Sequence, residues 1–141
     1  MPLKTGVPID IESRLRTLGA ALAAASPDIE FAYLFGSAST GDMTPRSDID
    51  VAIYVSESAD AHQTRLETSR IAAGHLGTDA IDIVLLNAAP IALAGRVLTS
   101  RRVLLDRRPF LRHRFESLTA RMFQDFRIRE HRLLAERFGR G

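Results

Sequence analysis

The chain has 141 residues, of which 45% are hydrophobic, so it is long and apolar enough to bury a core of the size found in one domain. It contains no cysteine, which excludes disulfides and thiol chemistry and leads us to expect a protein of the reducing cytoplasm. No apolar run reaches the roughly 18 residues of a membrane span, and the N-terminal residues lack the apolar segment of a signal peptide, so we expect no membrane association.

The formal net charge of +2 is unevenly distributed along the chain. Residues 107–141 contain 10 arginines and 4 acidic residues, whereas residues 1–106 contain 9 basic and 13 acidic residues. Residues 107–141 therefore have a net charge of +6, and residues 1–106 have a net charge of −4. A basic tail of this kind can face nucleic acid or an acidic protein, or it can be the solvated face of a helix.

Apolar residues recur with helical spacing in some segments and form short continuous runs in others. Helices are predicted over residues 9–25, 37–42, 61–76, 91–98 and from 109 onward. Strands are predicted over residues 29–35, 48–55, 80–86 and 102–105. This alternation predicts an α/β (α+β) fold, in which a small mixed sheet carries helices mainly on one face.

The chain is expected to form one domain over residues 1–141, with its core over about residues 9–106. A basic amphipathic helix is predicted over about residues 109–138. Its apolar stripe recurs at spacings of 3 and 4 and consists of Leu111, Phe115, Leu118, Met122 and Phe126. We expect this stripe to pack on the core or on a partner, with arginines on the opposite face. Because the aromatic residues are spaced for one apolar helical face and not for base stacking, nucleic acid is not an expected partner.

The most informative stretch joins the end of one predicted strand to the start of the next. Gly36 lets a backbone approach a bulky anion, and Ser37, at a predicted helix N-terminus, offers a hydroxyl and a free N–H to phosphate. Ten residues later, Asp48 and Asp50 lie two positions apart, so both carboxylates leave the strand on the same side. Two carboxylates this close repel each other, and a divalent metal with oxygen ligands would neutralise them. Either half alone is common in ordinary turns, but together they indicate a nucleotide site.

The pattern Gly36-Ser37, ten residues, then Asp48-x-Asp50 is the signature of the polymerase-β-like nucleotidyltransferase superfamily, which this chain resembles. The length is similar to that of its minimal nucleotidyltransferase (MNT) branch, the antitoxins encoded beside HEPN-domain toxins. The resemblance is strong over about residues 29–106 and weak over the tail. It implies the polymerase-β-like nucleotidyltransferase fold, in agreement with the predicted elements.

A third carboxylate, Asp82, interrupts the apolar strand over residues 80–86. A lone carboxylate inside a strand is costly unless it is paired or binds a metal, although Asp82 could instead be solvated at a frayed strand end. The resemblance implies that Asp82 is the family's third carboxylate and lies beside Asp48 and Asp50.

The chemistry that the resemblance implies is transfer of AMP from ATP to a tyrosine hydroxyl of a cognate HEPN toxin, which neutralises the toxin and releases pyrophosphate. Mg²⁺, as two ions, would be held by Asp48, Asp50 and Asp82, and Asp82 could take the proton of the acceptor. Gly36 and Ser37 would bind the β- and γ-phosphates of ATP.

One position departs from the branch. Its members often read Gly-Ser-x-Ala-Arg-Gly, whereas this chain has Thr40 in place of the arginine and no other basic residue between Gly36 and Gly41. Arg46 or Arg65 could supply the missing positive charge from elsewhere. The departure bears on nucleotide affinity more than on the metal chemistry.

Two other functions are compatible with the same residues. The first is a nucleotidyltransferase that acts on a small-molecule hydroxyl such as that of an aminoglycoside. Such enzymes usually carry an acceptor-binding domain larger than residues 107–141 can form. The second is a non-catalytic antitoxin that inhibits by binding, with the nucleotide site retained as a relic.

Overall fold

The computed structural model describes residues 7–138. Its helices are α1 (Ile11–Ala25), α2 (Ser37–Thr40), α3 (Ala61–Leu76), α4 (Ile91–Thr99) and α5 (Pro109–Phe138), with a 3₁₀ turn η1 (Leu86–Ala88). Its strands are β1 (Ile29–Phe35), β2 (Ile49–Val55), β3 (Ile81–Leu85) and β4 (Arg102–Asp106). Each of these helices and strands was predicted from the sequence, with bounds that differ by at most two residues.

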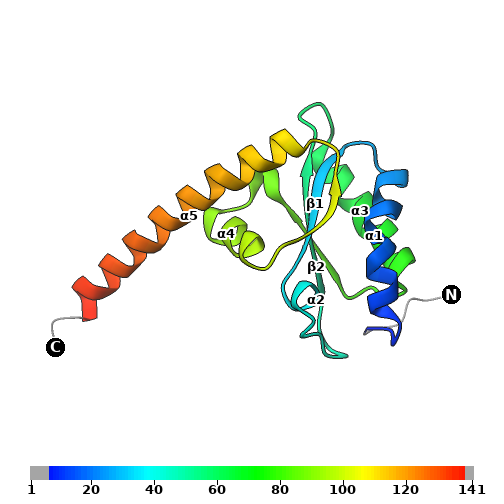
Figure 1. Ribbon diagram of the computed structural model, residues 1–141, viewed down its shortest axis with the longest axis horizontal. Helices are drawn as coiled ribbons and strands as arrows, with labels where there is room; N and C mark the ends of the chain where they lie inside the picture. The colour runs from blue at the N-terminus through cyan, green and yellow to red at the C-terminus, as the bar shows by residue number, and fades with distance from the viewer. Residues whose placement is uncertain (1–6, 139–141) are drawn as a thin grey trace.

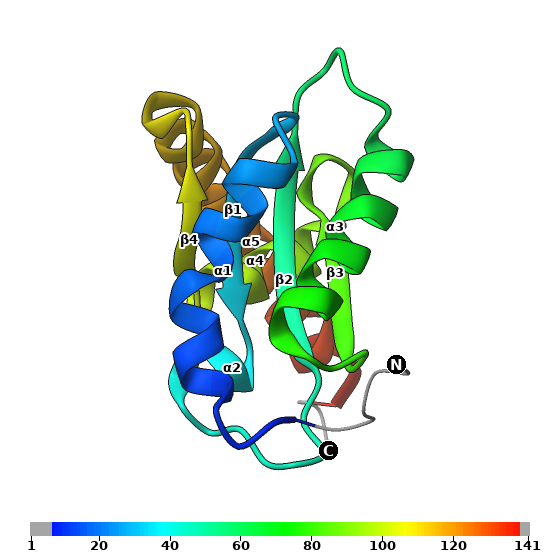
Figure 2. The same ribbon diagram turned by 90° about the vertical axis from the view of Figure 1, so that its right-hand side faces the viewer.

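The four strands form one mixed sheet (Figure 1), in which their order is β3-β2-β1-β4 (Figure 2). β1 pairs antiparallel with both β2 and β4, and β2 pairs parallel with β3. The parallel pair requires a crossover connection, and α3 supplies it. The predicted mixed sheet is confirmed.

One face of the sheet is closed by α1 and α3, which lie side by side over the strands (Figure 2). Residues at helical spacing on α1 meet alternate residues of β1 and β2, as the two periodicities require. The resulting apolar core has members that are at most 1% exposed, among them Leu15, Leu18, Leu22, Leu34 and Ile53. We call this side the closed face.

The other face of the sheet, which we call the open face, is covered by α4 and the first part of α5 (Figure 1). Its apolar cluster is aromatic: the Phe31 ring stacks on Tyr54 with centroids 4.8 Å apart and contacts Phe115 at 5.6 Å. The sequence predicted helices mainly on one face, and the structure covers both. The reason is that β1 and β2 carry large apolar side chains on both sides, so each side needs a helix to exclude water.

The last helix, α5, divides into two parts. Leu111 and Phe115 pack on the cluster of the open face, whereas Leu118 and Met122 are 52% and 50% exposed. With 30 residues, α5 is about 45 Å long, roughly twice the length of the strands beneath it, so its distal part extends past the sheet (Figure 1). The predicted apolar stripe is therefore core at its start and uncovered farther along.

The length of α5 does not make it a membrane span. No helix within residues 7–138 is both long enough and apolar enough to cross a bilayer.

Candidate active site

Strand β2 places the carboxylate of Asp50 on the open face. Ile49, Val51 and Ile53 are fully buried on the closed face. Asp50 lies between them in sequence and therefore points the other way, half-buried, opposite Phe35 of β1. Asp48 precedes the first residue of β2 by one position and is exposed.

Strand β3 brings the third carboxylate to the same place. The parallel register aligns Asp82 with Asp50, so the two side chains leave adjacent strands on the same face. Asp82 is exposed because β3 is the edge strand of the sheet. Burial therefore does not oblige Asp82 to find a partner, contrary to the cost that the sequence suggested for a carboxylate inside an apolar strand.

The three aspartates leave a concentration of negative charge without a counter-charge. Burial raises the pKa of the Asp50 carboxyl above its ordinary value of 3.8, and the nearby carboxylates of Asp82 and Asp48 raise it further. Among residues 7–138, no ion pair includes any of the three. The site is therefore suited to bind a cation.

The turn at Gly36 lies directly over Asp50. Gly36 has a φ of 69°, in the left-handed region, and a Cβ at this position would come within 2.6 Å of the Asp50 Oδ2. Both the backbone conformation and the close approach therefore require glycine. The Gly36 N–H donates to the Ser100 Oγ at 2.9 Å, and Ser37 then begins α2.

A cavity of about 530 Å³ opens between this turn and α4. Gly36, Asp50 and Asp82 line it from the side of the sheet. One side of α4 lines it from above through Leu93, Arg96, Thr99 and the adjoining Ser100. The structure thus brings together three of the five predicted site residues, whereas Ser37 and Asp48 lie next to this group in sequence but do not line the cavity.

Arg96 and Ser100 were not among the site residues predicted from the sequence. Arg96 is the one basic residue among those that line the cavity in the described part of the chain. Of the arginines that the sequence offered, Arg65 lies on α3, which packs on the closed face, and Arg46 lies in the exposed turn before β2. A weak signal was available, since positions 93, 96 and 100 fall on one side of a helix that follows the third carboxylate.

The donor chemistry of the three aspartates fits a magnesium ion. Carboxylate oxygens are the ligands that this ion prefers. A bound ion would also reduce the repulsion between Asp50 and the nearby carboxylates of Asp82 and Asp48. No trio of His, Cys, Asp or Glu side chains within residues 7–138 already stands in metal-binding geometry. Asp48 and Asp82 are exposed, so their side chains can change rotamer and turn toward Asp50.

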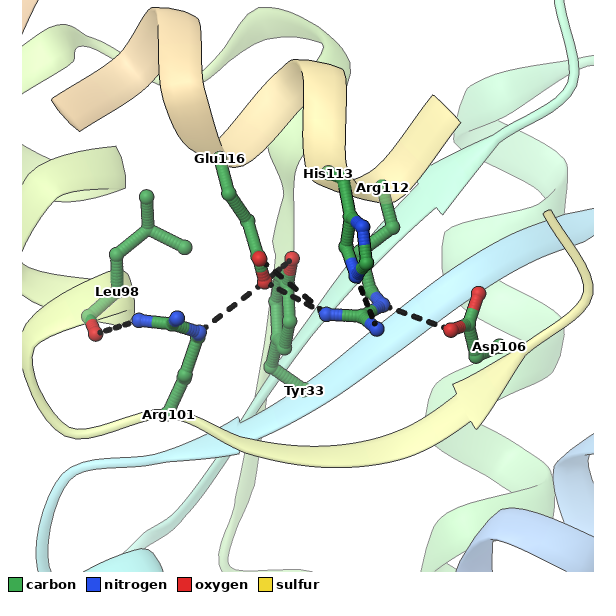
Figure 3. A network of polar contacts seen from close by, with 7 residues as sticks. All are labelled: Tyr33, Leu98, Arg101, Asp106, Arg112, His113 and Glu116. Carbon is green, nitrogen blue, oxygen red and sulfur yellow. Dashed lines mark hydrogen bonds and ion pairs between the residues drawn. The ribbon is translucent and has the colours of Figure 1, made fainter. Parts of the chain in front are cut away.

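A polar network ties the first part of α5 to the sheet (Figure 3). The Tyr33 hydroxyl donates to the Glu116 Oε2 at 2.7 Å, and Glu116 pairs with Arg101 and Arg112, both at 3.1 Å. Arg112 also pairs with Asp106 at 2.8 Å. Burial, followed by the Glu116 carboxylate, raises the pKa of Tyr33 far above its usual range, so Tyr33 stays a donor at physiological pH. Because Arg101 follows Ser100 directly, the network holds the end of α4 against the Gly36 turn.

A family model described as polymerase beta, nucleotidyltransferase, matches residues 20–110 of the chain. The match includes all five predicted site residues and Arg96. Comparison with curated protein sequences finds no match.

Solved structures of toxin–antitoxin complexes resemble the chain over most of its length. A toxin–antitoxin with AMP-PNP is 27% identical at a TM-score of 0.68, covering 89% of this chain and 96% of that one. A tri-AMPylated HEPN toxin in complex with an MNT antitoxin from Shewanella oneidensis is 24% identical at a TM-score of 0.65, with 89% and 96% covered. A mutant of the MntA–HpeT toxin–antitoxin is 24% identical at a TM-score of 0.68, with 86% and 96% covered. The two at 24% identity establish the fold.

Proposed function

The chain belongs to the polymerase beta nucleotidyltransferase family, and from this we propose that it is an MNT-type antitoxin that transfers AMP from ATP to a tyrosine hydroxyl of a cognate HEPN toxin. The observation that carries the proposal is the set of Asp48, Asp50 and Asp82 without a counter-charge, beside a Gly36 turn at the edge of a cavity. Neighbouring structures that contain AMP-PNP or an AMPylated HEPN toxin support it.

In the proposed reaction, the acceptor oxygen attacks the α-phosphorus of ATP, the bond from that phosphorus to the bridging oxygen breaks, and pyrophosphate leaves. Magnesium held by Asp48, Asp50 and Asp82 would neutralise charge on the phosphate oxygens. Asp82, exposed at the sheet edge, would accept the proton of the incoming hydroxyl.

The Gly36 turn would hold the phosphates beyond the attacked one. Its N–H already bonds a side-chain oxygen, that of Ser100, at 2.9 Å. A phosphate oxygen of the nucleotide would take the place of this hydroxyl, because one N–H makes one strong hydrogen bond. Ser37, at the start of α2, would add its own hydroxyl.

The distal part of α5 is the surface that we propose for docking the toxin. A groove of about 800 Å³ lies between α4 and this part of the helix, lined by apolar side chains that include Leu98, Phe123 and Leu134. Arg127 lies over the Phe123 ring, 5.9 Å from its centroid, so the groove combines apolar area with positive charge. An acidic, apolar protein surface would suit it.

The direct test incubates the purified chain with its neighbouring HEPN protein, ATP and magnesium, and follows the intact mass of that partner. We expect AMP adducts on a tyrosine of the partner with the wild-type chain, and none with a variant in which Asp48 and Asp50 are both asparagine. A partner that never gains AMP, although it forms a complex with the wild-type chain, would refute the transfer reaction.

Inhibition by binding alone is a second candidate, favoured by Thr40 standing where the branch often has arginine. It predicts that the double asparagine variant neutralises the toxin as well as the wild-type chain does, without ATP. A small-molecule acceptor is less suitable, because residues 109–138 form a single helix and not an acceptor-binding domain.

A further inference from the structure

We propose that Arg96 binds the phosphates of the nucleotide and supplies the positive charge that the turn from Gly36 to Gly41 lacks. The inference rests on the proposed function in assuming that the cavity beside Asp50 holds a nucleotide. It goes further by naming the residue that recognises the phosphates.

The charge balance of the cavity calls for a cation from the protein. Its walls contain the carboxylates of Asp50 and Asp82, and a triphosphate would add several further negative charges. The turn over Asp50 contains no basic residue, since Thr40 occupies the position of the branch's arginine. Arg96 is the basic residue that the described part of the chain places in the cavity lining.

The position of Arg96 on α4 places it within reach of the phosphate turn. The Oγ of Ser100, which directly follows the helix, accepts a hydrogen bond from the Gly36 N–H at 2.9 Å. Arg96 precedes Ser100 by four residues, about one helical turn or about 6 Å along the axis, and lies on the same side. An extended arginine side chain spans a comparable length, so its guanidinium can approach an anion bound at Gly36.

The orientation of α4 is fixed by close packing on its other sides. Val97 is fully buried and Leu98 is 9% exposed in the apolar cluster of the open face. Gly95 lies so near α5 that a Cβ there would overlap the Phe123 ring. The helix therefore cannot rotate Arg96 away from the cavity without breaking these contacts.

The guanidinium of Arg96 has no side-chain partner in the described part of the chain. It is in no ion pair and no side-chain hydrogen bond within residues 7–138, and its residue is exposed. Arg101, the next arginine along the chain, is instead held by Glu116 at 3.1 Å and by the Leu98 carbonyl at 2.8 Å. The planar fork of a free guanidinium suits two phosphate oxygens at once.

The test measures equilibrium binding of AMP-PNP and of adenosine, with magnesium, to the wild-type chain and to Arg96→Gln. We expect AMP-PNP to bind Arg96→Gln about ten- to a hundredfold more weakly, the usual effect of losing a charge-assisted hydrogen bond, while adenosine binding stays unchanged. Arg96→Lys should recover part of the affinity. Arg65→Gln, on the closed face, and Arg46→Gln are the matched controls and should bind AMP-PNP like the wild-type chain.

Unchanged AMP-PNP affinity in Arg96→Gln would overturn the proposal, as would an equal loss for AMP-PNP and adenosine, which would place Arg96 against the nucleoside. A loss in Arg46→Gln instead would assign the missing charge to that residue. If the wild-type chain itself binds no AMP-PNP, the nucleotide site fails and this inference fails with it. Binding that is intact in the wild-type chain and in Arg96→Gln would refute only the role of Arg96.

Discussion

The two faces of the sheet differ in what their side chains can do. The closed face, under α1 and α3, is filled by apolar residues such as Leu18 and Ile53 that are fully buried. The open face, under α4 and α5, holds the carboxylates of Asp50 and Asp82, the cavity beside them and the Tyr33–Glu116 network. Since side chains alternate along a strand, β2 contributes Ile53 to one face and Asp50 to the other.

From this division we expect that stability and chemistry can be altered separately in this sheet. A charge on the closed face would be buried without compensation, so that face can only hold the fold together. The open face tolerates repelling carboxylates because the edge strand β3 and the cavity leave them partly in water. Substitutions matched between the two faces should therefore have opposite profiles, and the following predictions test that expectation.

The largest effect is expected from Asp50→Asn on the open face. Losing a metal-binding carboxylate should lower AMP transfer by about a thousandfold or more, because several kcal/mol of transition-state stabilisation depend on it. The melting temperature without magnesium should stay equal or rise, because the substitution removes a repelling charge. Transfer assays and thermal melts of the same sample check both parts, and activity within tenfold of the wild-type chain would contradict the assignment.

The difference in stability between the wild-type chain and Asp50→Asn should depend on pH. The folded-state pKa of Asp50 is raised above its ordinary value of 3.8, so ionising Asp50 costs the folded state free energy. Below that ordinary value both states are protonated and the wild-type chain should match Asp50→Asn in stability. As the pH rises through the raised folded-state pKa, the stability of the wild-type chain should fall relative to the variant. Melts in the absence of magnesium across this range measure the difference.

The second effect in size is expected from Leu18→Ala on the closed face. Leu18 is fully buried, so the truncation should cost about 2–5 kcal/mol in the free energy of unfolding. Nucleotide affinity of the folded fraction should not change, because no site residue lies on that face. Denaturant unfolding combined with AMP-PNP binding distinguishes this profile from that of Asp50→Asn. A specific loss of affinity in folded Leu18→Ala would show that the faces are coupled.

A smaller effect is expected from Tyr33→Phe, which removes the hydroxyl that donates to Glu116 at 2.7 Å. Glu116 keeps Arg101 and Arg112, so we expect a loss of about 1–2 kcal/mol in the free energy of unfolding. Tyr54→Phe is the matched control on the same face, because Tyr54 makes no side-chain hydrogen bond among residues 7–138. If both variants unfold at the same denaturant concentration, the network does not stabilise α5.

The smallest effect is expected from charge reversal on distal α5. Changing Arg121, Arg127 and Arg129 to glutamate should slow association with the HEPN partner about tenfold at low salt, with less difference at high salt. Reversing Arg16, Arg65 and Arg70 on the helices of the closed face is the control and should leave association unchanged. Association rates over a salt series give the answer. Equal rates for the two triple variants would mean that distal α5 is not the docking surface.

The sequence alone determined the elements and the face on which each strand residue lies. Periods of two and of 3.6 depend only on local geometry, so the bounds of the strands and helices, and the opposite faces of Asp50 and its neighbours Ile49 and Val51, could be predicted from spacing. The motif around Gly36 likewise indicated the family, because its residues are close in sequence.

Only the tertiary structure decided how segments distant in sequence lie relative to one another. Tyr33 and Glu116 are 83 residues apart, and no local pattern links them. Arg96 enters the site, and Arg65 does not, because α4 packs on the open face and α3 on the closed face. Asp82 is exposed because β3 lies at the edge of the sheet. Met122 is exposed because α5 is longer than the strands and extends past the sheet. Each depends on which elements pack together, and packing is settled by burial over the whole chain and not by neighbours in sequence.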